Sequence, residues 1–167
     1  MNIAEVKSTA QTGDIVATVS SLLVRAATWE SFSHVATILR EHNNVFVVET
    51  HENTGSTSKI PFDDWIKGYK EVYLGIAPKI VANNRDQVAG YIYQYLKKKP
   101  KNLKYGYWTL PLVFLNQIWT KKKFKTKLNV CSTLAQEFWN ASGWKLGKLA
   151  DPGDIALECL VLYRIVQ

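Results

Sequence analysis

The residues that could do covalent chemistry are few, because the 167-residue chain has two cysteines and three histidines. Cysteine catalysis needs a thiolate, a base within hydrogen-bond reach and a third group that orients the base. Cys131 opens a stretch with helical spacing, where free N–H groups and the helix dipole lower a thiol pKa and can hold an oxyanion. Cys131 is therefore the candidate nucleophile, although a small buried core residue would give the same pattern.

The candidate base is His34, at the start of a β-prone segment, and Glu49 ends the next such segment after turn-forming residues. If the centre of the hairpin loop lies between Glu41 and His42, His34 and Glu49 face each other directly on one side of the sheet. A carboxylate in that place orients the imidazole and stabilises its charged form. A structural histidine or a surface ion pair would look identical.

The remaining reactive residues fit other roles. His51, in the polar stretch after the hairpin, is an alternative polar partner for the base. Cys159 is expected in the core of the last strand, and with Cys131 it could form a disulfide or stay reduced. No metal-ligand spacing is present, so neither zinc nor another cofactor is expected. Asp14 and Asp154 follow glycines at expected strand starts and should bond to nearby backbone groups.

The elements that must position these residues follow from periodicity and turn signals. Strands are expected over 15–19, 34–39, 45–49, 70–76 and 155–166, and helices over 61–66, 83–96 and 131–141, with Gly143 ending the last helix. Residues 52–58 should form an exposed loop, and 101–127 show little periodicity. Hairpins join the early strands, which predicts an α+β fold with a mainly antiparallel sheet packed against helices. We expect one domain, 1–167.

The charge of the chain is strongly positive, at +7. Most of it comes from two lysine clusters, Lys97, Lys98, Lys99 and Lys101, then Lys121, Lys122, Lys123 and Lys125. Such clusters suit an anionic polymer or surface, but they are also typical of solvated loops. Nucleic acid is a minor hypothesis, because no recognition motif accompanies them. The sequence has no apolar run long enough for a membrane span and no signal peptide, which favours a cytoplasmic location.

Five short motifs, taken in order, resemble the circularly permuted papain-like proteins. These are the YiiX-like relatives of NlpC-type cell-wall peptidases and of lecithin–retinol acyltransferase. In unpermuted members the cysteine helix precedes the histidine strand, whereas here His34 precedes Cys131. The motifs are Gly13-Asp14-Ile15-Val16, Ser33-His34-Val35-Ala36, Val47-Val48-Glu49, Val130-Cys131-Ser132-Thr133-Leu134 and Pro152-Gly153-Asp154-Ile155.

The resemblance implies a permuted papain-like fold with a partly barrel-like sheet. It implies Cys131 as nucleophile, His34 as base and Glu49 as the third polar residue, with Ser132 assisting the oxyanion or substrate. Tyr105 resembles a tyrosine that precedes the cysteine helix in this group, although Gly106 stands where an aspartate is expected.

The activity that the resemblance implies is thiol hydrolysis or acyl transfer at an amide or ester, through a thioester. A cell-wall peptide amide is the leading expected substrate, and a lipid amide or ester is second. Two alternatives come from other classes of protein: a binding module that keeps the fold without catalysis, and a basic nucleic-acid-binding protein, whose affinity would fall steeply with salt.

Overall fold

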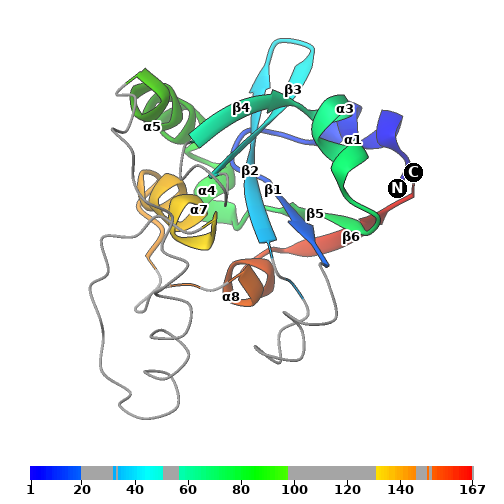
Figure 1. Ribbon diagram of the computed structural model, residues 1–167. Helices are drawn as coiled ribbons and strands as arrows, with labels where there is room; N and C mark the ends of the chain where they lie inside the picture. The colour runs from blue at the N-terminus through cyan, green and yellow to red at the C-terminus, as the bar shows by residue number, and fades with distance from the viewer. Residues whose placement is uncertain are drawn as a thin grey trace, which may run out of the picture.

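The computed structural model describes residues 1–19, 32, 34–50, 57–97, 131–145, 150 and 152–166. Its helices and strands follow one another along the chain, with Figure 1 showing their arrangement. They are α1 (Ile3–Thr9), β1 (Ile15–Thr18), β2 (His34–Glu41), β3 (Asn44–Thr50), β4 (Thr57–Pro61), α3 (Phe62–Trp65), the 3₁₀ turn η1 (Ile66–Gly68), β5 (Val72–Ile76), α4 (Lys79–Ala82), α5 (Arg85–Lys97), α7 (Cys131–Asn140), α8 (Pro152–Leu157) and β6 (Val161–Ile165).

The strands form one six-stranded sheet in the order β4-β3-β2-β1-β5-β6, and every neighbouring pair is antiparallel. The predicted α+β class with an antiparallel sheet is therefore confirmed. The order has two ends, and within the described part of the chain β4 and β6 do not pair with each other. The partly barrel-like closure is accordingly not confirmed, since the sheet is open.

Helices cover both faces of the sheet, so strand residues alternate between two cores. In β1, Ile15 and Ala17 pack on the side of α5, α7 and α8, while Val16 packs on the side of α1 and α3. Figure 1 shows α5 and α7 on one side of the sheet and α1 and α3 on the other. Because both faces are covered, all four residues of β1 are buried.

Several short elements were not predicted from the sequence, among them α1, α4 and β4. α1 begins at a capping box in which Asn2 accepts from the Glu5 N–H and the Glu5 carboxylate accepts from the Asn2 N–H. α4 follows Pro78, which suits the position before a first helical turn. β4 overlaps the segment expected as a loop, because residues 57–61 pair with β3 despite their polar composition.

The predicted strand over 155–166 was wrong in its first half. Residues 152–157 form α8, with Pro152 at its first position and Asp154 in its first turn, both typical of a helix start. The strand is confined to β6. Cys159 therefore lies between the two elements and is half-buried, not in the interior of a strand.

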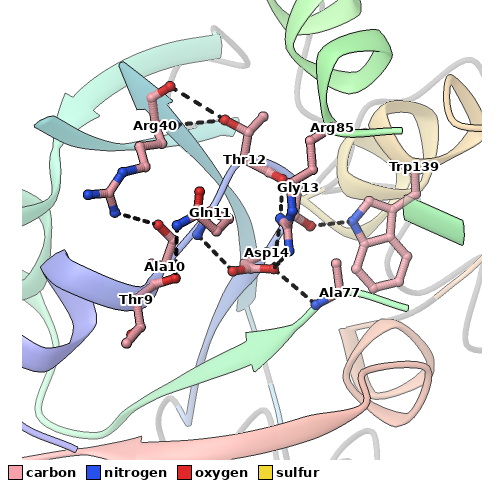
Figure 2. A network of polar contacts seen from close by, with 10 residues as sticks. All are labelled: Thr9, Ala10, Gln11, Thr12, Gly13, Asp14, Arg40, Ala77, Arg85 and Trp139. Atoms are coloured by element: carbon pink, nitrogen blue, oxygen red, sulfur yellow. Dashed lines mark hydrogen bonds and ion pairs between the residues drawn. The ribbon is translucent and has the colours of Figure 1, made fainter. Parts of the chain in front are cut away.

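A polar network around the turn before β1 joins elements that are distant in sequence (Figure 2). Asp14 is buried, and its carboxylate accepts from the Gln11 N–H at 2.8 Å and the Ala77 N–H at 3.1 Å. The Arg85 guanidinium donates to the same carboxylate through two nitrogens, each at 3.1 Å. The expected bonds from Asp14 to nearby backbone are confirmed, and the carboxylate also ties α5 to the sheet.

The same turn holds α7. The Trp139 indole N–H donates to the Gly13 carbonyl at 2.7 Å, as Figure 2 shows. Gly13 has φ +91°, and a Cβ there would lie 2.9 Å from the Val81 side chain, so glycine is required at this position. The helix that begins at Cys131 is thus fixed to the start of β1. None of the described helices is both long and apolar enough to cross a membrane.

Candidate active site

Cys131 is the first residue of α7, as predicted, and α7 packs against β2. The apolar stripe of α7 is buried on the side of the sheet that carries Val35. Cys131 is only 6% exposed. Gly143, at φ +88°, follows the end of the helix in the left-handed conformation that was expected there. The helix therefore presents its N-terminal end to the first residues of β2.

His34 is the first residue of β2, and its Nε2 lies 2.7 Å from Oε2 of Glu49 on β3. Both side chains are buried, with 9% and 5% of their surfaces exposed. The pairing predicted from the hairpin is thus present as a contact. Since Nε2 bonds to the carboxylate, Nδ1 is the ring nitrogen left for the thiol.

The register that brings these two residues together differs from the predicted one. Glu41 pairs with Asn44, so the turn residues are 42 and 43, and His42 adopts a positive φ of 53°. The partner of each β2 residue is therefore displaced by two positions, and His34 and Glu49 are diagonal neighbours. A displacement of two positions keeps both side chains on one face, and a diagonal pair is within reach of long side chains.

Two aromatic residues, which the sequence alone does not assign to the site, contact Glu49 and His34. The Trp65 indole N–H donates to Oε2 of Glu49 at 2.7 Å, and Trp65 is buried. The Tyr69 ring lies parallel to the His34 imidazole, with centroids 6.1 Å apart, and contacts the Trp65 ring at 4.5 Å. A buried indole N–H needs an acceptor, but nothing in the spacing says that it is Glu49.

The electrostatics of the site favour charge separation between the thiol and the imidazole. Burial by itself lowers the pKa of His34. The Cys131 thiolate attracts the ring and hydrogen-bonds to it, and the Glu49 carboxylate adds to this effect. Together these two groups outweigh burial and raise the pKa of His34 from 6.5 to about 10. Burial raises the pKa of the Cys131 thiol, but His34 and the backbone N–H groups of Val35 and Ser132 lower it overall. The arrangement can hold a thiolate beside an imidazolium, the reactive form of a cysteine nucleophile.

The second thiol has the opposite character. Both cysteines are free, so they form no disulfide with each other. Burial, with the nearby charges of Asp14 and Glu158, raises the pKa of Cys159 to about 12. Its thiol donates to the Ile155 carbonyl at 3.5 Å. Cys159 should therefore be far less nucleophilic than Cys131.

Several predicted site and partner residues lie outside the described part of the chain: Tyr105, His51, Lys98, Lys99, Lys101, Lys121, Lys122, Lys123 and Lys125. Lys97 ends α5 and is exposed. Ser132 is buried beside Cys131, and its backbone N–H is directed to the thiolate. Within the described ranges, no group of three or more histidine, cysteine, aspartate or glutamate residues could hold a metal ion.

Comparison with solved structures shows a likeness of fold. The chain is similar to the crystal structure of the metalloprotein yiiX from Escherichia coli O157:H7, DUF1105, with a TM-score of 0.60 and 15% sequence identity. The alignment covers 94% of this chain and 97% of that one. At this identity the likeness concerns the fold alone. No protein-family model and no curated protein matches the chain.

Proposed function

We propose that the chain is a thiol hydrolase or acyltransferase, in which Cys131 is the nucleophile, His34 the base and Glu49 the residue that orients it. One observation carries this proposal. A thiol at a helix N-terminus, an imidazole and a carboxylate lie in series, and the pKa of the thiol is lowered while that of the imidazole is raised. Buried structural cysteines have the opposite tendency, as Cys159 illustrates.

The proposed reaction begins with His34 holding the proton of the Cys131 thiol. The thiolate attacks the carbonyl carbon of an amide or ester, and the carbonyl π electrons move to oxygen. N–H groups at the start of α7, including that of Ser132, stabilise this oxyanion. The intermediate collapses to a thioester as the C–N or C–O bond breaks, and the leaving group takes the proton from His34.

The second half of the reaction uses the same groups in reverse. Water, or an amine or alcohol acceptor, loses a proton to His34 and attacks the thioester carbonyl. The C–S bond then breaks, and the thiolate of Cys131 is restored beside the imidazolium. Glu49 accepts a hydrogen bond from His34 throughout, so it keeps the ring oriented and compensates its positive charge.

The likeness to yiiX supports placing the chain among the permuted papain-like proteins, because the motif order in the sequence resembles the same group. The yiiX protein is described as a metalloprotein. Among the described residues of this chain, no group of three or more histidine, cysteine, aspartate or glutamate residues could hold a metal ion, and the proposed reaction is assigned to the side chains of the chain itself. A cell-wall peptide amide is the proposed substrate, with lipid amides or esters second.

The experiment is labelling with an acyl probe that forms a stable thioester, followed by peptide mass spectrometry. We expect the label on Cys131 and not on Cys159, loss of the label in His34→Ala, and retention of it in the control Cys159→Ser. Equal labelling of both cysteines, unaffected by the His34 substitution, would instead indicate a binding module without catalysis. Incubation with wall fragments or with lipids, and a search for an adduct on Cys131, distinguishes the two substrate classes.

A further inference from the structure

Glu49 is held by more than its contact with the base. A single carboxylate oxygen, Oε2, accepts from His34 Nε2 at 2.7 Å and from Trp65 Nε1 at 2.7 Å. Glu49 is on β3, His34 on β2 and Trp65 at the end of α3, so three elements converge on one atom. An oxygen with two N–H donors has a fixed position, because displacement lengthens both bonds.

The surroundings of this oxygen explain why the indole N–H matters. Glu49 is 4% exposed, and a buried carboxylate is costly unless hydrogen bonds compensate for its lost hydration. Ser58 pairs with Glu49 across β3 and β4, but its hydroxyl has no hydrogen-bond partner among the described residues, so it does not hold the carboxylate. Trp65 itself is fixed by packing against Tyr69, whose ring is stacked on the base.

From this geometry we infer that Trp65 is a positioning residue of the proposed site, acting on His34 and Cys131 through Glu49. The indole N–H keeps the carboxylate turned toward the imidazole. The inference rests on the proposed function for its catalytic meaning. In physical terms, loss of the Trp65 indole N–H on α3 should reduce the fraction of Cys131, on α7, that is ionised.

Trp65→Phe is the variant that tests this, because phenylalanine keeps an aromatic ring and removes the donor. Without the donor the carboxylate is more easily displaced from His34, so it stabilises the imidazolium less, and the imidazolium in turn stabilises the thiolate less. We expect the pH at which the Cys131 thiolate forms to rise by about one unit, the size of a lost hydrogen bond to a charged group. The readout is the ultraviolet absorbance of the thiolate, taken as a difference from Cys131→Ser.

Two controls separate positioning through Glu49 from other effects of a substitution. Tyr93→Phe also removes a donor to a carboxylate, that of Glu41 at 2.9 Å, but Glu41 lies at the other end of β2 from His34, so this variant should leave the thiolate titration unchanged. Glu49→Gln can keep both hydrogen bonds and removes the charge. In that background, Trp65→Phe should have little further effect, because the charge through which it acts is already absent.

The outcomes are distinct. A shift of about one unit in Trp65→Phe that disappears in the Glu49→Gln background supports the inference. An equal shift in both backgrounds, or the same shift in Tyr93→Phe, overturns it, as does a Trp65→Phe titration identical to that of the wild type. The absorbance difference between the wild type and Cys131→Ser tests the proposed function separately. If this difference shows no thiolate in the wild type at neutral pH, the proposed function itself is wrong.

Discussion

The pH dependence of stability should carry a characteristic signature of the Cys131–His34 pair. The pKa of His34 is raised in the folded state, so its contribution is fully present below pH 6.5 and is lost as pH rises to about 10. The pKa of Cys131 is lowered from 9.0, so its contribution is present above pH 9.0 and is lost as pH falls through the folded value. Between pH 6.5 and 9.0 the two slopes oppose each other, because the contribution of His34 falls with rising pH while that of Cys131 increases.

The magnitude follows from the difference in the number of protons that the unfolded and the folded states bind. One proton of difference changes the free energy of unfolding by about 1.4 kcal/mol per pH unit. From pH 9.0 to about 10 only His34 differs between the two states, so the contribution of the pair should fall by about 1.4 kcal/mol over that unit.

The assay is urea unfolding at a series of pH values, with the double variant Cys131→Ser/His34→Gln subtracted at each pH. The subtraction removes titrating groups far from the pair. We expect the contribution of the pair to decline between pH 9.0 and about 10. No decline over that unit would refute the reasoning, because it requires that the folded imidazole has already lost its proton.

Two further predictions concern the turn that fixes α7, and urea unfolding measures both. Asp14→Ala should reduce the free energy of unfolding by about 3 kcal/mol, because the Gln11 and Ala77 N–H groups lose their acceptor and the partly exposed Arg85 loses its ion-pair partner. A loss below about 1 kcal/mol would contradict the importance of this network. Gly13→Ala should lower the free energy of unfolding by roughly 2–3 kcal/mol, because of the positive φ and a 2.9 Å contact with the Val81 side chain. The control Gly90→Ala, inside α5 with open space around it, should raise the free energy of unfolding by about 0.5–1 kcal/mol. Equal effects at the two positions would refute this explanation.

The candidate site could be predicted in large part because its residues depend on local rules. Cys131 precedes a strongly periodic apolar stripe, and such stripes predict helix starts well. His34 and Glu49 flank a hairpin, and strand alternation keeps them on one face in the predicted register and in the observed one. The register itself was missed because the sequence does not show that His42 enters the left-handed region and moves the turn.

The rest of the site depends on packing between distant segments. Trp65 reaches Glu49 because β4 pairs with β3 and brings α3 to that face, and the first residues of β4 lie in the segment 52–58 that was expected to be a loop. The helix α8 was missed because residues 155–166 read as one β-prone run, although Pro152 and Asp154 are suited to a helix start. In both cases tertiary contacts outweighed the local pattern.

The most direct test of the account is the protonation state of the His34 ring, measured by ¹⁵N NMR. The chain has only three histidines, so the ring signals can be assigned with single substitutions. At about pH 8, where an ordinary histidine is neutral, His34 should show two protonated nitrogens and should lose the second proton only near pH 10. A ring that is neutral at that pH and titrates near 6.5 would contradict the thiolate–imidazolium pair on which the proposed chemistry depends.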